Sequence, residues 1–318
     1  MNALVSVIMS TYNEDLDWIK DSVESILNQT YTNFEFIIIL DKPENNILKE
    51  LLYEYKGKDE RVKIIVNKQN MGLAMSLNEG IKIAKGKYIV RMDADDISFP
   101  ERIEKEVMYL EDNKLDMVST NRIDMDEEGK FLPAKSSLPK TESVNKILPI
   151  GNFIAHPTVL IKTDVIKAVN GYRNFSTSQD YDLWLRILSS GYKIGILDEP
   201  LLYYRIRENS ISKSDKYKQY LINKYQKELY KRRLKNGDDE FSIENMKKFL
   251  DKFNYYDDKN RNRFNHAHQV FSNGIVKIKR KQYIGGLLQI LGSIIKHKEM
   301  GKYIRDIYIY KTMSKRWS

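Results

Sequence analysis

The 318-residue sequence contains no cysteine and no long apolar run. The lack of cysteine excludes disulfides, thiolate catalysis and cysteine-based zinc sites, and it fits a reducing cytoplasm. No apolar stretch approaches the roughly 20 residues that a membrane-spanning helix needs. Met1 is followed directly by a strand-like segment, with polar Asn13 and Glu14 soon after, which is not the pattern of a signal peptide. The length predicts one large domain with an appendage, or two modest domains.

Acidic residues are scarce in the last third of the chain. Residues 1–210 contain 27 Lys and Arg against 33 Asp and Glu, a net charge of −6, whereas residues 211–318 contain 26 against 11, a net charge of +15. An acidic globular part with a basic, mainly helical extension predicts an anionic partner for the extension. A solvated helical face is the alternative, but the mixture of Lys and Arg with Ile, Leu and Tyr favours an anionic membrane surface. The apolar segment Tyr283–Ile295 is too short to span a membrane and suits an interfacial or packed helix.

Apolar, β-branched runs alternate with segments of helical periodicity through the first 120 residues. Strands are expected at Leu4–Ser10, Phe34–Leu40, Val62–Val66 and Tyr88–Met92, with helices between them. Nearly continuous apolar strands and short connections predict an α/β fold with a mostly parallel, doubly wound sheet. The strand ends at Thr11, Asp41 and Asp93 would then open on one rim, where ligands of such sheets bind.

The segments that follow are less regular. We expect a helix at Pro100–Asn113 preceded by a capping box of Ser98 and Glu101. Further elements expected from the pattern are a strand near Met117–Thr120, a hairpin turn at Asp124–Lys130, a helix that follows Ser178 as its N-cap, and a short strand at Leu201–Ile206.

Three carboxylates, Asp93, Asp95 and Asp96, follow the strand at Tyr88–Met92 directly. Carboxylates so close together repel one another, and a cation would neutralise them. All-oxygen ligands favour Mg²⁺ or Mn²⁺, with phosphate oxygens as further partners. An Asp-x-Asp pair alone is weak evidence, because it also occurs in solvated turns and helix starts. The other pairs of this kind are Asp15/Asp17, Asp124/Asp126 and Asp180/Asp182, and none of them follows a convincing buried strand.

Together, the ordered motifs resemble those of the inverting family-2 glycosyltransferases, which have a GT-A fold. The matching segments are Val7-Ile8-Met9-Ser10-Thr11-Tyr12-Asn13, Asn70-x-Gly72-Leu73-Ala74, Leu77-Asn78-x-Gly80, Ala84-x-Gly86-x-Tyr88-Ile89-x-Arg91-Met92-Asp93-Ala94-Asp95-Asp96, His156-Pro157-Thr158 and Asp180-Tyr181-Asp182-Leu183-Trp184-Leu185-Arg186. The likeness covers about residues 3–210 and is greatest to the bacterial capsule and exopolysaccharide branch. It implies a GT-A domain at 1–210, with a nucleotide-binding half at 1–120 and an acceptor-binding half at 121–210, followed by the helical basic region 211–318.

The resemblance also assigns roles to single residues. A UDP-sugar donor would be bound by Thr11, Asn13, Asp41, Gly72, Asn78, Arg91, Asp93 and Arg207. Asp95 would ligate Mn²⁺ or Mg²⁺, with Asp93 at the ribose or a metal-bound water. Asp180 matches the base that takes the proton of the acceptor hydroxyl, and the acceptor would be bound by His156, Asp182 and Trp184. Structural roles are the alternatives for these residues: a helix cap for Asp180, a loop carboxylate for Asp41, a hydrogen-bonded structural histidine for His156, a structural carboxylate for Asp182 and a core position for Trp184.

Four positions depart from the family pattern. Lys42-Pro43-Glu44 replaces the common Asp-Gly-Ser after Asp41, Leu77 and Gln179 replace a frequent arginine and glutamate, and Arg207 replaces a metal-ligating histidine. Guanidinium does not bind metal ions, but it binds phosphate well.

The predicted function is sugar transfer to a saccharide or lipid-linked saccharide, in the cytoplasm at the inner face of the cell membrane. Competing predictions are a nucleotidyltransferase or a phosphatase that uses the same Asp-x-Asp corner, and a sugar-nucleotide-binding relative with weakened catalysis. The nucleotidyltransferase lacks its expected Gly-rich phosphate loop, because Thr11-Tyr12-Asn13-Glu14 occupies that turn. No nucleic-acid motif is present, and the acidic N-terminal part argues against nucleic acid as a partner.

Overall fold

The computed structural model describes residues 3–133, 138–207 and 215–317, and the chain forms two compact units. The first consists of Met1–Leu148, Asn152–Arg207 and Trp317–Ser318, and the second of Pro149–Gly151 and Glu208–Arg316. The domain boundary predicted at residue 210 falls outside the described residues.

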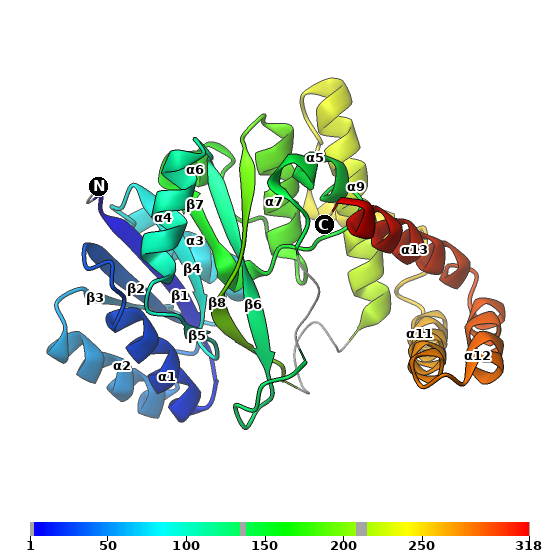
Figure 1. The fold of residues 1–318 in the computed structure, drawn as a ribbon, viewed down its shortest axis with the longest axis horizontal. Helices are drawn as coiled ribbons and strands as arrows, with labels where there is room; N and C mark the ends of the chain where they lie inside the picture. The colour runs from blue at the N-terminus through cyan, green and yellow to red at the C-terminus, as the bar shows by residue number, and fades with distance from the viewer. Residues whose placement is uncertain (1–2, 134–137, 208–214, 318) are drawn as a thin grey trace. The chain divides into compact units, whose positions relative to one another are not determined.

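The first unit is built on an eight-stranded sheet with the order β3-β2-β1-β4-β7-β6-β8-β5 (Figure 1). The strands are β1 (Val5–Thr11), β2 (Phe34–Leu40), β3 (Val62–Val66), β4 (Tyr88–Asp93), β5 (Ile97–Ser98), β6 (Met117–Met125), β7 (Val159–Lys162) and β8 (Ile194–Arg205). Strands β3, β2, β1 and β4 are parallel, as is the pair β6 and β8, whereas β7 and β5 run antiparallel to their neighbours. The sheet is therefore mixed, and its N-terminal half is the doubly wound part that the alternating pattern predicts.

Helices cover both faces of this sheet. They are α1 (Leu16–Leu27), α2 (Asn46–Lys58), α3 (Leu73–Ile83), α4 (Arg102–Asp112), α5 (Val144–Ile147), α6 (Thr163–Ala168) and α7 (Gln179–Ser189), with 3₁₀ turns at Thr141–Ser143 and His156–Thr158. Apolar residues of α1, α2 and α4 share one core with Val5, Val7 and Met9 of β1. On the opposite face, Gly80 of α3 packs directly against Ile8. Since successive side chains of a strand point to opposite faces, a strand buried on both sides is apolar throughout.

The register of the parallel strands brings three strand ends to one rim. Ser10 lies opposite Asp93, and Thr11 lies opposite Leu40, the residue before Asp41. The backbone N–H of Asp41 also donates to the carbonyl of Thr11 (2.8 Å). The predicted common rim at Thr11, Asp41 and Asp93 is therefore confirmed.

One local prediction, the cap at Ser98, is wrong, and another, the strand at Leu201–Ile206, is confirmed except for its start. Ser98 does not cap a helix. It lies in β5, where it pairs with Leu202 of β8, and α4 begins at Arg102 without a side-chain cap. The short strand expected at Leu201–Ile206 is the second half of β8, which starts at Ile194 and passes through Pro200. The register between β6 and β8 shifts beside Pro200, as is usual where a proline cannot donate to the ladder.

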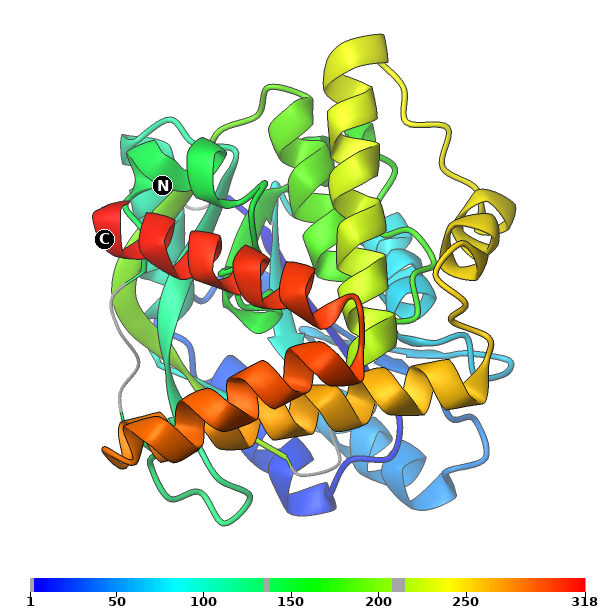
Figure 2. The same cartoon turned by 90° about the vertical axis from the view of Figure 1, so that its right-hand side faces the viewer.

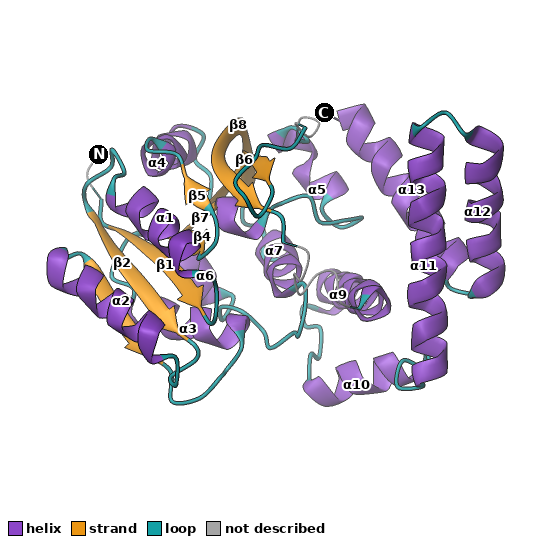
Figure 3. Ribbon diagram, turned by 90° about the horizontal axis from the view of Figure 1, so that it is seen from below, coloured by secondary structure: helices purple, strands orange, loops and turns teal. Residues whose placement is uncertain are grey.

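The second unit is helical, as its sequence predicts (Figure 3). Its helices are α9 (Lys216–Asn236), α10 (Ile243–Asp251), α11 (Asp258–Lys279), α12 (Tyr283–Lys296) and α13 (Met300–Trp317). Stacked and edge-on rings of Tyr217, Tyr220, Phe264 and Tyr303 form much of its core. Among the described residues, no helix combines the length and the apolar character needed to cross a bilayer.

A buried ion pair supports the strand that carries the acidic residues. Arg102 Nε donates to Glu106 Oε1 (2.9 Å) and Arg102 Nη2 to the carbonyl of Arg91 (3.0 Å), and both side chains of the pair are fully buried. Glu106→Ala leaves the Arg102 charge without its partner, so the free energy of unfolding in urea is expected to fall by about 3–5 kcal/mol. Asp112→Ala, on an exposed position of the same helix, is expected to change it by less than about 0.5 kcal/mol. Equal losses in the two variants would contradict the proposed support.

Candidate active site

The end of β4 gathers three carboxylates. Oxygen atoms of Asp93, Asp95 and Asp96 all lie within 4.8 Å of one another, and Asp95 and Asp96 are buried. The turn is fixed from two sides: Ser22 Oγ of α1 donates to the carbonyl of Asp93 (2.9 Å), and Arg205 Nε of β8 donates to that of Asp95 (2.9 Å). Distant elements thus hold like charges together, an arrangement that needs compensating cations.

Two arginines neutralise this acidic corner, which we define as Asp93, Asp95 and Asp96. Arg91 Nη1 lies 2.5 Å from Asp93 Oδ1, and Arg207 Nε lies 2.8 Å from Asp95 Oδ2. The Arg91 side chain is only 2% exposed. Burial opposes its charge, but the carboxylate of Asp93 raises its pKa. The ion pair with Asp93 thus places Arg91 beside the acidic corner, and its role in binding the nucleotide sugar stays a prediction.

Burial and mutual repulsion change the protonation of the corner. Burial and then the charge of Asp93 raise the pKa of Asp95 to about 6, although Arg207 opposes this shift. Burial, Asp93 and Asp95 raise the pKa of Asp96 well above its usual range. Asp96 Oδ1 accepts from the backbone N–H of Arg205 (2.8 Å), whereas its buried Oδ2 has no hydrogen-bond partner among the described residues.

These residues fit a hard divalent cation. The donor atoms are all carboxylate oxygens, one of them is buried without a partner, and a dication would relieve the repulsion that raises the pKa of Asp95. Asp93 and Asp95 would hold it, as the motif predicts. Arg207 lies at the position where the family pattern has a metal-ligating histidine, and its guanidinium contacts the carboxylate of Asp95 instead.

Asp41 orders the loop on the nucleotide side of the rim. Its carboxylate accepts hydrogen bonds from Asn67 Nδ2 (2.7 Å) and from the backbone N–H groups of Met71 (2.8 Å) and Gly72 (2.8 Å). Gly72 has φ 78°, in the left-handed region that favours glycine, and it begins α3 there. A carboxylate has about four acceptor positions, so one is left for a ligand. The predicted contact between Asp41 and a nucleotide base stays a prediction.

Thr11 and Asn13 lie at the end of β1 with partners inside the protein. Thr11 Oγ1 donates to Glu14 Oε2 (2.7 Å), and Asn13 Oδ1 accepts from Lys42 Nζ (3.0 Å). Lys42 Nζ also lies 5.4 Å from the centre of the Tyr12 ring, which is 42% exposed. The substitution after Asp41 therefore adds a cation to this rim, beside an accessible aromatic ring.

Asp180 lies in the first turn of α7, where the sequence places it. Its Oδ2 accepts from Asn152 Nδ2 (2.9 Å). Burial raises the pKa of Asp180, while hydrogen bonds from the backbone and from Asn152 oppose the shift. A carboxylate with a raised pKa is a better proton acceptor when ionised, as a general base requires.

A tyrosine joins the predicted acceptor residue His156 to α3. His156 Nε2 lies 2.8 Å from the Tyr172 hydroxyl. Both polar atoms of the Asn78 amide bond the backbone of Tyr172, at 2.8 Å each. The amide of Asn78 thus holds the backbone of Tyr172, and the expectation that Asn78 borders the nucleotide pocket stays a prediction. Burial and then the charge of Arg91 lower the pKa of His156 well below its usual range, so its imidazole is neutral at pH 7.

Asp182 and Trp184 are fully buried, as the structural alternative expects, and their contact with the acceptor stays a prediction. Asp182 Oδ2 accepts from Arg186 Nε (2.8 Å), one helical turn further on. The same guanidinium donates to the carbonyls of Val169 and Gly171 and so holds the loop that presents Tyr172. Trp184 packs edge-on against His156, with ring centres 6.0 Å apart. Asp182 thus holds the guanidinium of Arg186, and Trp184 packs against the imidazole of His156.

Arg91 connects the acidic corner with Asp180. Its charge acts on Asp93, Asp95 and Asp96 and also on Asp180, His156 and Tyr172. Burial raises the pKa of Tyr172, and the negative charges of Asp180 and Asp93 both raise it further. The turn that contains His156 packs against β4, and Trp184 of α7 packs against His156, so the acidic corner and the candidate base lie near one another in the first unit.

The sequence did not single out Tyr172, Asn152 or Asp96 as functional. Asp96 belongs to the quoted acidic motif, which was a usable signal. Asn152 and Tyr172 lie in loops, and no local pattern relates them to Asp180 or His156, which are 28 and 16 residues away in the chain.

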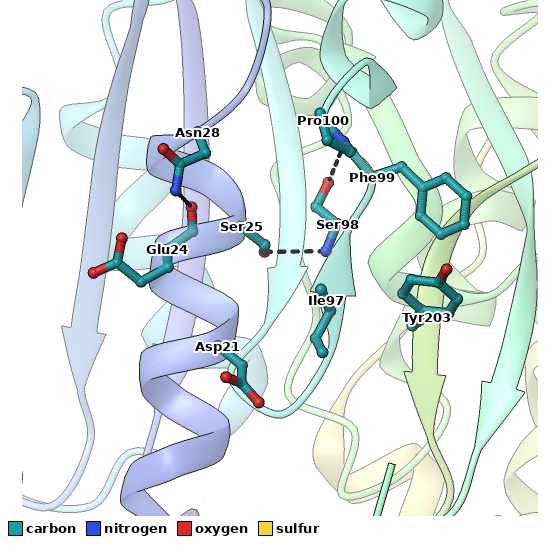
Figure 4. Close-up of a pocket in the computed structure, with 9 residues that line it drawn as sticks. All are labelled: Asp21, Glu24, Ser25, Asn28, Ile97, Ser98, Phe99, Pro100 and Tyr203. Atoms are coloured by element: carbon teal, nitrogen blue, oxygen red, sulfur yellow. Dashed lines mark hydrogen bonds between the residues drawn. The ribbon is translucent and has the colours of Figure 1, made fainter. Parts of the chain in front are cut away.

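A pocket of about 450 Å³ lies beside α1 and contains none of the predicted site residues (Figure 4). It is lined by Asp21, Glu24, Ser25, Asn28, Ile97, Ser98, Phe99, Pro100 and Tyr203. The backbone N–H of Ser98 donates to Ser25 Oγ (3.0 Å), which ties β5 to α1 at this place.

Comparison with known proteins decides the family. The model described as "Glycosyl transferase family 2" matches residues 6–169, which is more than half of the chain. This chain belongs to glycosyl transferase family 2. The glycosyltransferase is 41% identical over 213 residues to the O-antigen biosynthesis glycosyltransferase WbnJ of Escherichia coli, covering 66% of this chain and 83% of WbnJ. It is 40% identical over 221 residues to an uncharacterized glycosyltransferase of Methanocaldococcus jannaschii, covering 68% of this chain and 76% of that protein.

Solved structures show the same fold. S. aureus TarS (residues 1–349, in complex with UDP-GlcNAc) superposes with a TM-score of 0.60 at 18% identity, covering 98% of this chain and 90% of TarS. The GT-A fold and the enzyme class predicted from the motifs are therefore confirmed.

Proposed function

We propose that this glycosyltransferase transfers a sugar from a UDP-sugar to an acceptor hydroxyl with inversion at the anomeric carbon. The observation that carries the proposal is that β4, which ends at the acidic corner, and α7, which begins with Asp180, both pack against the turn at His156, and that the charge of Arg91 acts on Asp95 and on Asp180. Such a site brings a candidate base and a candidate diphosphate site together. TarS, which shares the fold, has been crystallised with UDP and with UDP-GlcNAc.

The chemistry follows from the charges of the site. Asp180, oriented by Asn152, accepts the proton of the acceptor hydroxyl as its oxygen attacks the anomeric carbon and the bond to the diphosphate breaks. A single displacement of this kind inverts the configuration and needs no enzyme nucleophile. A divalent cation at Asp93 and Asp95, for which we propose Mn²⁺ or Mg²⁺, supplies Lewis-acid stabilisation of the diphosphate charge. Arg207 adds a second positive charge beside Asp95.

We propose a saccharide or lipid-linked saccharide as the acceptor, in capsular or exopolysaccharide biosynthesis at the inner face of the cell membrane. Relatives support this direction. WbnJ is named for O-antigen biosynthesis, and Bacillus subtilis TuaG, 30% identical over 219 residues, is a putative teichuronic acid biosynthesis glycosyltransferase. In this proposal His156, which is neutral and bonded to Tyr172, binds an acceptor hydroxyl without competing with Asp180 for its proton.

The deciding experiment measures UDP release from a panel of UDP-sugars, with and without Mn²⁺, alone and with candidate lipid-linked acceptors. We expect release to depend on the metal and to increase when the correct acceptor is present. Binding without any release would support a weakened sugar-nucleotide-binding relative instead. Phosphate release from a phosphoester, without sugar transfer, would support a phosphatase.

Asn152→Ala tests the environment of the proposed base. The Asn152 amide lowers the pKa of Asp180, so its removal is expected to raise that pKa further. A base must be ionised to act, so the acidic limb of the kcat–pH profile should move to higher pH. A profile that keeps its acidic limb while kcat falls at all pH values would argue against Asp180 as the titrating base.

A further inference from the structure

Helix α12 buries its small residues and exposes its large ones. The buried residues of this helix are Gly286 and Ser293. A Cβ atom at Gly286 would lie 2.8 Å from the carbonyl oxygen of Gly274 in α11, and one at Gly274 would lie 2.9 Å from that of Gly286. The two helices therefore touch backbone to backbone, and Figures 2 and 3 show them side by side. Among the large apolar side chains of α12, Ile290 packs against Gly274, whereas the others are exposed.

The large side chains form one exposed stripe, here called the α12 apolar face. It consists of Tyr283, Ile284, Leu287, Leu288, Leu291, Ile294 and Ile295. Intervals of three and four residues place these side chains on one side of a helix. Ile284 is 79% exposed and Ile295 is 84% exposed. A contiguous apolar surface of this kind marks an interaction site rather than ordinary surface variation.

The charges beside this face indicate the partner. Between Lys259 and Lys298 the chain contains no Asp or Glu. Basic residues stand at both ends of α12: Lys277, Lys279, Arg280, Lys281, Lys296 and Lys298. An apolar helix face with cations at its borders matches the apolar interior and anionic headgroups of a lipid bilayer. A second copy of the same face would bring like charges together without acidic partners.

We infer that α12 lies in the headgroup layer of an anionic membrane with its apolar face toward the acyl chains. The helix has 14 residues and is about 21 Å long at 1.5 Å per residue, which is too short to span a bilayer but suits a helix that lies in its plane. This inference deepens the proposed function, on which it rests for the reason that an enzyme with a lipid-linked acceptor must reach the bilayer surface.

The test is co-flotation of the full chain with vesicles, in the absence of any sugar nucleotide. Wild-type protein is expected to float with phosphatidylglycerol-containing vesicles and much less with pure phosphatidylcholine. Leu288→Asp/Leu291→Asp should lower the partition coefficient at least about tenfold, because it puts charge on the face that enters the membrane. Leu234→Asp, at a 60% exposed apolar position of α9, is the matched control and should float like wild type. Arg280→Gln/Lys281→Gln should weaken flotation, most strongly at low salt.

Three outcomes would overturn the inference. The first is that the double aspartate variant floats as well as wild type, and the second is that wild type binds both vesicle types equally. The third is that wild type binds no vesicles and is a dimer, whereas the double variant is a monomer. The last result would assign the face to a contact between two copies. UDP release to a soluble acceptor is measured in parallel and should be unchanged in the double variant. Failure of flotation with normal UDP release then counts against the membrane surface alone, and absence of UDP release in wild type counts against the proposed function.

Discussion

Asp180→Asn is expected to lower kcat by about 10²–10⁴-fold, the contribution typical of one positioned general base, with little change in the affinity for UDP. Asparagine has nearly the same shape and can still accept from Asn152, so the helix start should keep its geometry. It cannot take a proton from the acceptor hydroxyl. Steady-state kinetics with donor and acceptor give kcat, and calorimetry with UDP and Mn²⁺ gives the affinity.

Asp17→Asn provides the matched control for this variant. Asp17 is also a first-turn aspartate, in α1, but its side chain is 84% exposed and pairs with Lys20 on the surface. We expect activity within twofold of wild type, as is usual for such surface pairs. If Asp180→Asn kept nearly full kcat, or lost UDP binding in proportion to activity, Asp180 would not be the base.

Asp95→Asn is expected to abolish the metal dependence of UDP binding. The substitution removes a charged metal ligand, and even changes one shell further out commonly cost about 10–100-fold in metal affinity. It also leaves Arg207 without its carboxylate partner 2.8 Å away, so some UDP affinity should persist in the absence of metal. Calorimetric titration of UDP with Mn²⁺, and again with a chelator, separates the two contributions.

Asp126→Asn, from another Asp-x-Asp pair, is the control for sequence pattern. Asp126 Oδ1 accepts from the backbone N–H of Lys130 in a turn, and asparagine can do the same. Its UDP binding should equal that of wild type. If UDP with Mn²⁺ bound Asp95→Asn as tightly as wild type, the acidic corner would not be part of the donor site. The same would follow if wild type bound UDP equally well with Mn²⁺ and with a chelator.

The rim of the site could be predicted from the sequence because its parts are local. Each of Thr11, Asp41 and Asp93 follows an apolar strand directly, and parallel strands bring their carboxyl ends to one edge. The family motifs then supplied Asp180, at the start of a helix that the sequence also marks. These inferences needed only strand order and the position of a residue next to an element boundary.

The roles of Asp182 and Trp184 could not be read in this way. Every residue of α7 from Tyr181 to Ile187 is buried, so the helix has no exposed face whose periodicity would separate core from site. Tyr172 and Asn152 were missed because their partners are set by how loops meet α3 and α7. The register between β6 and β8 likewise depends on an irregularity beside Pro200 that no local sequence pattern predicts.

Arg205, the last residue of β8, and Arg207, just after it, contact the acidic corner from roughly 110 positions further along the chain. During synthesis on a ribosome, Asp93, Asp95 and Asp96 leave the exit tunnel long before Arg205 and Arg207. The parallel half of the sheet can form early, but its most charged turn must wait, with three carboxylates in mutual repulsion, for the last strand. The contacts of Arg205 and Arg207 with the acidic corner are therefore among the last of the sheet to become available, and a nascent chain that ends before Arg205 would lack them.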